Sequence, residues 1–328
     1  MLQIGDQFDR FQITGHIAQG GMSDIYRAYD VVNRCEVALK IPERTMIGDP
    51  AQYERFQREK EVLQTFDHPA VLHGLGCGQY NRIPFLAMEL IEGQSLRDFI
   101  AASAPLPPEQ AVALFTRIAD GMAYVHENGV IHRDLKPENI ILRKDGQPVI
   151  MDFGLALTKS AHRVTYANLS ATMGTPTYMA PEQVEGKRGD ERTDVYALGV
   201  ILFELLAGEP PFNGDSPLAV MAQHVQQPAP RLDQVKSGTD VHLAAVVAKA
   251  LARDPEQRYA TVRELITALE HPETADLSIL AEKAQPGKAP EAPAEKWYQS
   301  MYFKSIAIAF VILASLIALA FALQGLKN

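Results

Sequence analysis

The first forty residues alternate between hydrophobic and polar positions and break at glycine and asparagine. A period of two is typical of half-buried β-strands, so the pattern predicts strands over residues 11–16, 25–29 and 36–41. A helical pattern follows over residues 51–66. The beginning of the chain is therefore expected to be a β meander followed by one helix.

Two apolar runs come next, at residues 71–75 and 84–90, and helical patterns dominate from Ser95 onward. The pattern predicts a small β-rich part followed by a larger helical part. After Glu270 the chain becomes rich in Ala, Pro, Glu and Lys and has little to bury. This composition predicts a linker over residues 271–304, part disordered and part extended.

Residues 305–323, "SIAIAFVILASLIALAFAL", contain no charge, proline or glycine. A helix of this length is about 28 Å long, enough to cross a bilayer. A buried core helix is the alternative, but such helices are usually shorter and this segment lies beyond a linker. Aromatic side chains precede the segment, as at a membrane interface: Trp297, Tyr298, Tyr302 and Phe303. We predict a single C-terminal transmembrane helix.

The charges beside this span predict its orientation. Lys296 and Lys304 precede it and only Lys327 follows, so its N-terminal side is expected in the cytoplasm. The protein is then expected in the cytoplasmic (inner) membrane, single-pass, with residues 324–328 as a short extracytoplasmic tail. No extracellular sensor domain is expected in this chain, so a signal would arrive through the cytoplasmic face, the bilayer or a membrane partner. No signal peptide is expected at the N-terminus, which lacks a basic run before an apolar stretch.

Composition narrows the classes of function. The chain has 328 residues, a net charge of −9 and a pI near 5.5. Nucleic acid is not expected as a partner, because phosphate backbones demand a basic surface. Cys35 and Cys77 are far apart and lack metal-ligand spacing, so we expect reduced, buried thiols rather than a disulfide.

The strongest chemical signals are "HRDLKPEN" at residues 132–139 and "DFG" at residues 152–154. Together they supply two carboxylates and an amide that could converge on a metal-bound phosphate. The tripeptide alone could be any turn. An octapeptide followed thirteen residues after its Asn139 by this tripeptide is not a plausible accident.

With these motifs, the sequence resembles bacterial eukaryotic-like (Hanks-type) serine/threonine protein kinases. The resemblance covers roughly residues 8–270, and its motifs occur in the expected order. It implies an α+β, two-lobed protein kinase fold with a small β-rich N-terminal lobe and a larger helical C-terminal lobe. It further implies ATP and Mg²⁺ (or Mn²⁺) as cofactors and proteins as substrates.

"VALK" resembles the strand that supplies a phosphate-binding lysine, Lys40. Its expected partner is a glutamate of the next helix, where Glu59 and Glu61 compete. At 100° per residue Glu59 falls within the apolar stripe and Glu61 points to the opposite side. The stripe consists of Phe56, Leu63 and Phe66. Glu59 is therefore the predicted partner, because a carboxylate on a buried stripe needs a cation.

The resemblance assigns roles to the remaining groups. Asp134 would orient the substrate hydroxyl and accept its proton, Asn139 and Asp152 would hold Mg²⁺, and Lys40 would grip the α and β phosphates. Lys136 resembles the lysine that contacts the transferring phosphate in kinases acting on serine and threonine. Similarly, Thr175 in "GTPTYMAPE" would bond both Asp134 and Lys136, which also favours alcohol acceptors.

The segments expected to bind the nucleotide match the family pattern less closely than the catalytic motifs do. "FLAMELIEG" looks like the hinge under adenine, with Met88 as gatekeeper and the backbone of Glu89 and Ile91 at the base. In "IAQGGMSDIYRA" the expected GxGxxGxV pattern reads Ala18, Gly20, Ser23 and Ile25, with Gly21 beside the second position. Ile17 and Ala38 complete the predicted nucleotide-binding set. On its own this stretch favours a β-turn, but the intact catalytic set favours a variant lid that binds nucleotide with altered affinity.

Three further matches are structural, and one is regulatory. Glu182 and Arg258 resemble a buried pair that anchors the activation segment, and Asp194 resembles the residue that steadies the catalytic loop. Arg133 resembles an arginine that pairs with a phosphorylated activation-segment residue. We predict autophosphorylation, with Ser170, Thr172 and Thr165 as candidate sites.

Three hypotheses follow. The leading one is an active, membrane-tethered serine/threonine protein kinase in bacterial signalling. A non-catalytic scaffold (pseudokinase) is motivated by Ala18 and Ser23 and opposed by the complete catalytic set. A small-molecule phosphotransferase is opposed by the "APE" element and the long activation segment. A metal-dependent protein phosphatase as antagonist is a family-level expectation, and a homodimer stays open.

Overall fold

The computed structural model describes residues 2–19, 23–43, 50–154, 156–158 and 176–281. They belong to the first of the two units of the chain, Met1–Lys283. Several predicted features lie outside the described residues. These are Gly20, Gly21, the candidate phosphorylation sites Thr165, Ser170 and Thr172, Thr175, and the apolar span at residues 305–323 with the tail that follows it.

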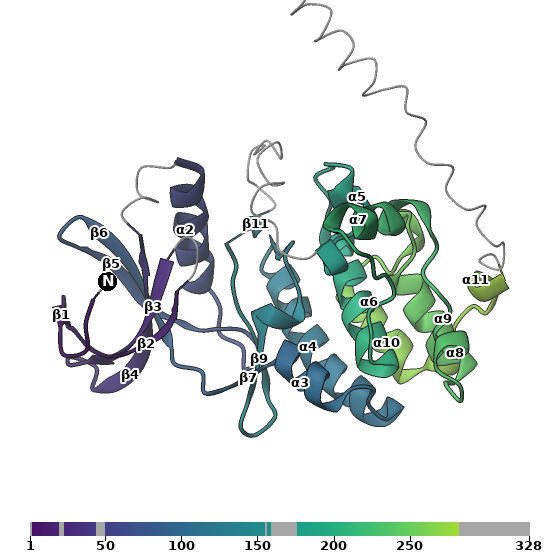
Figure 1. Cartoon of the computed structure of the whole chain (residues 1–328), viewed down its shortest axis with the longest axis horizontal. Helices are drawn as coiled ribbons and strands as arrows, with labels where there is room; N and C mark the ends of the chain where they lie inside the picture. The colour runs from purple at the N-terminus through teal and green to yellow at the C-terminus, as the bar shows by residue number, and fades with distance from the viewer. Residues whose placement is uncertain (1, 20–22, 44–49, 155, 159–175, 282–328) are drawn as a thin grey trace, which may run out of the picture. The chain divides into compact units, whose positions relative to one another are not determined.

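The N-terminal lobe is built on one antiparallel sheet with the strand order β1-β2-β3-β4-β6-β5 (Figure 1). The strands are β1 (Gln7–Phe8), β2 (Phe11–Gln19), β3 (Ser23–Asp30), β4 (Cys35–Pro42), β5 (Gly74–Tyr80) and β6 (Ile83–Glu89). The three strands predicted from the alternating pattern are confirmed as β2, β3 and β4. The apolar run at residues 71–75 mostly precedes β5.

Strand register places several residues predicted to bind nucleotide on one surface of the sheet. Ala38 is opposite Met88, and Lys40 is opposite both Ile25 and Leu86. Side chains two apart in a strand share a face, so Ala38 and Lys40 point the same way. The intervening Leu39 is fully buried in a separate cluster on the other face.

Helix α2 (Pro50–Leu63) confirms the predicted helix, ending three residues earlier than expected. Figure 1 shows it beside the sheet. Phe56, Leu63 and Phe66 are all at most 2% exposed, so the apolar stripe is indeed the packed side. The cluster that holds them continues into the helical part of the chain, which joins the lobes through one core.

The C-terminal lobe is mainly helical (Figure 1). Its longer helices are α3 (Leu96–Ser103), α4 (Pro108–Glu127), α6 (Glu191–Ala207), α7 (Pro217–Gln226), α9 (Val241–Ala250) and α10 (Val262–Glu270). Helix α6 is buried along nearly its whole length and packs against α4, α9 and α10. A helix that is apolar on every side needs such enclosure.

Short elements complete this lobe and carry the chemistry. The strands are β7 (Gly93–Ser95), β8 (Val130–Ile131), β9 (Ile140–Arg143), β10 (Pro148–Ile150) and β11 (Leu157–Thr158), and the short helices are η1 (Pro137–Asn139), η3 (Pro176–Tyr178), α5 (Pro181–Val184), α8 (Leu232–Val235), η4 (Pro255–Gln257), η5 (Pro272–Thr274) and α11 (Ser278–Ala281). Strands β7, β9 and β10 form one small sheet, and β8 and β11 form another.

The folded chain continues past the predicted end of the domain at Glu270. Helix α11 lies within the predicted linker, and its Leu280 is 3% exposed in a cluster with Ala245 and Ala248 of α9. A single leucine in a four-residue helix is too short a pattern to predict this docking.

Two other expectations concern the cysteines and the membrane. Cys35 is exposed at the start of β4, so its predicted burial is wrong, whereas Cys77 is half-buried. Within the residues described here, no helix is both long and apolar enough to span a membrane.

Candidate active site

The catalytic loop is held in place by one buried carboxylate. Asp194, near the start of α6, accepts hydrogen bonds from the backbone N–H groups of His132 and Arg133, both at 2.8 Å. Its Oδ2 also lies 2.8 Å from Nε2 of His126 in α4. Burial would raise the pKa of Asp194, but His126 and these donors outweigh burial and lower it. The carboxylate is therefore ionised and ties the loop to two helices.

Arg133 has a φ of 68°, which is uncommon for a non-glycine residue. The bonds from Asp194 and from the Gln183 side chain, which donates to the Arg133 carbonyl at 2.8 Å, hold this strained turn. Strained backbone persists only where its surroundings over-determine it, and it concentrates at functional sites. This strained turn directly precedes Asp134, the predicted catalytic base.

Asp134, Lys136 and Asn139 form a connected group. Lys136 Nζ donates to Asp134 Oδ2 at 2.8 Å, and Asn139 Nδ2 donates to the Asp134 backbone carbonyl at 2.8 Å. Because the amide nitrogen of Asn139 is used in this way, its side-chain oxygen is oriented away and can serve as a cation ligand. Thr175, the third predicted partner of Asp134, lies outside the described residues.

Lys40 and Glu59 form a close ion pair between β4 and α2. Lys40 Nζ lies 2.7 Å from Oε1 and 2.6 Å from Oε2 of Glu59, which is 3% exposed. Glu61, the competing glutamate, is exposed. Burial alone would lower the pKa of Lys40, but the carboxylates of Glu59 and Asp152 outweigh it and raise it. The lysine stays charged at neutral pH, as a phosphate-binding group must.

Asp152 and Phe153 place the second carboxylate. Asp152 has a φ of 61°, and the ring of Phe153 is fully buried against Phe66 and His132, at centroid distances of 5.1 and 4.9 Å. Asp152 is exposed to solvent, but its carboxylate is partly shielded by neighbouring protein atoms. This shielding would raise the pKa of Asp152, but Lys40 and His132 outweigh it and lower the pKa. It is therefore an ionised oxygen ligand.

Asn139 and Asp152 are suitable ligands for Mg²⁺. Mg²⁺ prefers oxygen ligands and is commonly bound by one or two carboxylates together with substrate phosphates. Backbone pairing brings the two segments together, because Met151 N–H donates to the Asn139 carbonyl at 2.8 Å. Within the described part of the chain, no cluster of three or more His, Cys, Asp or Glu side chains could bind a metal without such phosphates.

Most of the other residues predicted to bind nucleotide belong to strands β2, β3, β4 and β6 of the N-terminal lobe. Ala18 pairs with Ile25 across β2 and β3, while Ile17 is 48% exposed. Ala38 and Met88 are buried, at 8% and 5% exposure. Ser23 begins β3 and is also buried, at 7% exposure, so its hydroxyl is not freely open to solvent.

Residues 89–91 connect the lobes. The Glu89 N–H donates to the His73 carbonyl at 3.1 Å, and the Glu89 side chain pairs with Arg143 of β9 at 2.5 Å. Glu89 and Ile91, whose backbone is predicted to meet the base, both belong to this connection. The side chain of Glu89 thus ties the hinge to the C-terminal lobe.

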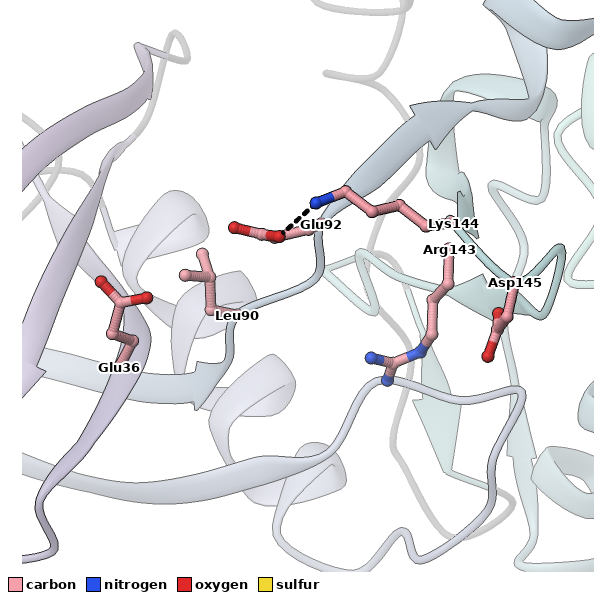
Figure 2. A pocket seen from close by; sticks show the side chains of 6 residues that line it. All are labelled: Glu36, Leu90, Glu92, Arg143, Lys144 and Asp145. Carbon is pink, nitrogen blue, oxygen red and sulfur yellow. Dashed lines mark hydrogen bonds and ion pairs between the residues drawn. The ribbon is translucent and has the colours of Figure 1, made fainter.

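A hollow of about 490 Å³ lies beside this connection. Figure 2 shows its lining residues, with Lys144 reaching Glu92. Arg27 of β3 pairs with both Glu36 and Glu92, so Glu92 links cations from both lobes. These pairs are exposed and each stabilises the protein little. The lining residues, none of which belongs to the predicted nucleotide set, are Glu36, Leu90, Glu92, Arg143, Lys144 and Asp145.

Glu182 and Arg258 form a buried bidentate pair. Arg258 Nη1 and Nη2 donate to the two carboxylate oxygens of Glu182, each at 2.8 Å, and the arginine side chain is 0% exposed. Burial would raise the pKa of Glu182, but the hydrogen bonds from Arg258 lower it. This pair connects α5, which follows the activation segment, to the segment that precedes α10.

Arg133 lies in a positively charged neighbourhood. Burial, together with the nearby Arg188 and Arg58, lowers the pKa of Arg133 to about 10 against the opposing effect of Asp194. Its guanidinium also donates to the Arg188 carbonyl. The positive charges of Arg188 and Arg58 near Arg133 would favour an anion at this position.

Sequence reasoning missed two groups of contacts. The first is the contact between His126 and Asp194, which are 68 residues apart. The second is the cluster of Arg97, Tyr178 and Glu204, whose members are at least 26 residues apart. Glu204 carried one usable signal, because it is a lone carboxylate in the otherwise apolar second half of α6 and therefore demands a cationic or hydroxyl partner.

With this geometry established, comparisons with known proteins identify the family. The family described as protein kinase domain matches residues 11–272. The chain belongs to this protein kinase family, whose members use ATP with Mg²⁺ or Mn²⁺. The two-lobed fold predicted from the sequence is confirmed.

Bacterial serine/threonine kinases are among the similar proteins. Serine/threonine-protein kinase PknB of Mycobacterium leprae is 37% identical over 289 residues, covering 87% of this chain and 44% of the relative. Serine/threonine-protein kinase PrkC of Bacillus subtilis is 34% identical over 256 residues, covering 78% of this chain and 39% of the relative. The chain thus spans less than half the length of these curated relatives.

The fold also resembles a solved structure. The Mycobacterium tuberculosis PknI kinase domain is 28% identical, with a TM-score of 0.66 over 83% of this chain and all of that domain.

Proposed function

We propose that this chain is an active, membrane-tethered serine/threonine protein kinase that transfers the γ-phosphate of ATP to hydroxyl groups of proteins, including its own activation segment. The observation that carries the proposal is the close pair of Lys40 and Glu59, with Nζ 2.7 and 2.6 Å from the two carboxylate oxygens. The pair stands beside Asp152 in a site that also contains Asp134 and Asn139.

Catalysis of phosphoryl transfer needs position and charge more than covalent chemistry. Lys40 would bind the α and β phosphates, and Glu59 would hold the Lys40 ammonium in position. Asn139 and Asp152 would hold Mg²⁺, which supplies charge neutralisation at the phosphates. Asp134 would orient the acceptor hydroxyl and take its proton, because its carboxylate is already aligned by Lys136 and Asn139.

The choice of alcohol acceptors rests on Lys136. Its ammonium lies 2.8 Å from Asp134 Oδ2, two residues along the same loop, where it would stabilise negative charge on the phosphoryl group in transfer. The resemblance to kinases acting on serine and threonine supports the same choice, as does Thr175. Protein rather than small-molecule acceptors are supported by the anchored "APE" element, whose Glu182 is fixed by Arg258.

Autophosphorylation is supported by the surroundings of Arg133. A phosphate carries nearly two negative charges and accepts strong hydrogen bonds from guanidinium groups. The positive charges of Arg58 and Arg188 near Arg133 would favour such a group. Ser170, Thr172 and Thr165 are the proposed sites.

The membrane tether is supported by the apolar segment at residues 305–323 alone. If it anchors the chain, the protein will sediment with membranes and resist extraction by carbonate at high pH. Replacing Ala314 and Leu316 with aspartate will release it, because charged residues near the middle of a span are costly. Carbonate extraction of the unaltered chain would contradict the tether.

The test of activity is intact-mass spectrometry of the full-length chain. The chain is first dephosphorylated and then incubated with Mg·ATP. We expect added phosphates on the wild-type chain and none on Asp134→Asn, which retains nucleotide affinity. Peptide mapping then identifies the modified residues. If the wild-type chain binds Mg·ATP and gains no phosphate, and also modifies no added protein, the scaffold hypothesis replaces this proposal.

A further inference from the structure

Strands β5 and β6 stop pairing one residue before the connection between the lobes. Their last paired residues are Gly74 and Met88, and the next two are His73 and Glu89. The Glu89 N–H donates to the His73 carbonyl at 3.1 Å, which is one half of an antiparallel pair. In a complete pair the His73 N–H would return a hydrogen bond to the Glu89 carbonyl. It donates instead to Oε1 of the Glu89 side chain, also at 3.1 Å.

The Glu89 carboxylate therefore replaces the Glu89 carbonyl as the acceptor for this N–H. A backbone N–H is a single donor, so His73 has its partner and does not draw the carbonyl into the sheet. Glu89 is also the first residue after the predicted gatekeeper, and its backbone is predicted to meet the base. Adenine has one exocyclic amine, and a backbone carbonyl is a complementary acceptor for it.

Arg143 of β9 holds the other carboxylate oxygen. Its Nη2 lies 2.5 Å from Oε2 of Glu89, and the two side chains are 31% and 26% exposed, so water screens this pair only in part. Figure 2 shows Arg143 and Lys144 running in different directions, with Lys144 turned towards Glu92. Among the described residues, Glu89 is the only acid within ion-pair distance of Arg143. The carboxylate is therefore fixed at both oxygens, by one donor from each lobe.

The donor side of the His73 bond is fixed by the end of α2. The ring Nδ1 of His73 lies 2.9 Å from the Phe66 carbonyl, which can only accept, so Nδ1 carries the proton. Gly74 passes so close to α2 that a Cβ there would lie 2.8 Å from the Leu63 carbonyl oxygen. With this segment held, the His73 N–H keeps its direction when the Glu89 side chain is changed. Without the carboxylate, the acceptor that completes the pair is the Glu89 carbonyl.

We propose that Glu89 is a positioning residue for the nucleotide. Its side chain occupies the His73 N–H and so keeps its own backbone carbonyl for the exocyclic amine of adenine. This inference rests on the proposed kinase function. It predicts that Glu89→Leu releases the His73 N–H to the carbonyl and loses the preference for the adenine amine. Glu89→Gln, which keeps an oxygen acceptor at the same place, should preserve that preference.

The alternative is that Glu89 only joins the lobes through Arg143. Joining by charge would be lost equally in Glu89→Gln and Glu89→Leu, and also in Arg143→Met, which leaves the Glu89 acceptor in place. Positioning through His73 separates these variants, since only Glu89→Leu removes the acceptor. The matched control is Glu92→Leu, in the same connection, because the Glu92 carboxylate also pairs with a cation of each lobe.

The test compares two nucleotides by calorimetry on the full-length chain: Mg·ATP and the Mg complex of purine riboside triphosphate, which lacks only the exocyclic amine. The wild type should bind ATP about fivefold more tightly, the value of one hydrogen bond. Glu89→Leu should reduce this ratio below about twofold by weakening ATP alone. Glu89→Gln, Arg143→Met and Glu92→Leu should keep it. The two nucleotides share ribose and phosphates, so a general loosening of the site would weaken both and leave the ratio unchanged.

A ratio in Glu89→Leu equal to that of the wild type would overturn the proposal. An equal loss in Glu89→Gln, Arg143→Met or Glu92→Leu would do the same, as would a wild type that binds both nucleotides equally. Glu89→Ala repeats the test with a smaller side chain, and failure of both acceptor-free variants to fold would overturn a role in positioning too. A wild type that binds nucleotide but transfers no phosphate would refute the proposed kinase function, and the ratio would still decide the role of Glu89.

Discussion

Removal of Arg258 should show how strongly the activation segment is anchored. Every N–H of its guanidinium has a partner: two oxygens of Glu182 at 2.8 Å each, and the carbonyls of Ala252, Arg192 and Arg253 at 2.7, 3.0 and 2.9 Å. The guanidinium also lies 4.8 Å from the ring centroid of Tyr196. Arg258→Met removes all five donors and leaves Glu182 buried without its cation.

Breaking a buried pair by removing one partner costs about 3–5 kcal/mol. For domains of roughly this size each kcal/mol lowers the melting temperature by about 2–4 °C, so a fall of about 6–20 °C is expected. Thr193 still donates to Glu182 at 2.9 Å, which softens the loss and favours the lower part of that range. Calorimetry of the full-length chain measures it directly.

The matched control is the double variant Glu182→Leu with Arg258→Met. With both charges replaced by apolar groups, no carboxylate remains unpaired, and the double variant should be more stable than Arg258→Met alone. A change below about 1 kcal/mol in Arg258→Met, the size expected for an exposed pair, would refute the reasoning. A double variant whose losses simply add would refute it equally.

Three further predictions concern the site and its supports. Glu59→Gln should lower kcat/KM for phosphate transfer at least about tenfold, because it leaves Lys40 without its close carboxylate. Glu61→Gln, on the exposed side of α2, should change kcat/KM less than twofold. Steady-state assays of both variants test this prediction. Burial lowers the pKa of His224 to about 4 from 6.5, so the unfolded state binds more protons between these values and stability should fall by about 2 kcal/mol from pH 8 to pH 5. Urea titrations at several pH values should show a flatter dependence of stability on pH in His224→Asn. An unchanged dependence would show that other groups cause it. Ala18→Gly and Ser23→Gly should each weaken ATP about two- to fivefold, since glycine costs more entropy to order, and unchanged affinity by calorimetry would make both substitutions irrelevant.

Local periodicity accounts for most of what could be predicted. The alternation in the first forty residues locates β2, β3 and β4, and the apolar stripe of α2 indicates that Glu59 points inward. These features depend on neighbours within one or two turns of chain. The expected burial of Cys35 rested on residue type alone and is wrong, because the first position of a strand can be exposed whatever residue occupies it.

Long-range contacts could not be predicted in this way. Arg97 and Glu204 are 107 residues apart, and His126 and Asp194 are 68 apart. Nothing in the residues around Arg97 distinguishes it from a solvated arginine on an amphipathic helix. Only the packing of α3 against the catalytic loop brings it to the carboxylates, and that packing is a property of the whole core.

Trans-phosphorylation tests the central claim most directly. Full-length wild-type chain is mixed with Mg·ATP and a mass-tagged full-length Asp134→Asn chain, and phosphate on the tagged chain is measured by intact-mass spectrometry. The proposed function predicts phosphate on serine or threonine of the inactive copy, dependent on Mg·ATP and abolished when the wild-type partner is replaced by Lys40→Met. Phosphate on neither copy, from a folded wild-type chain that binds Mg·ATP, would contradict it.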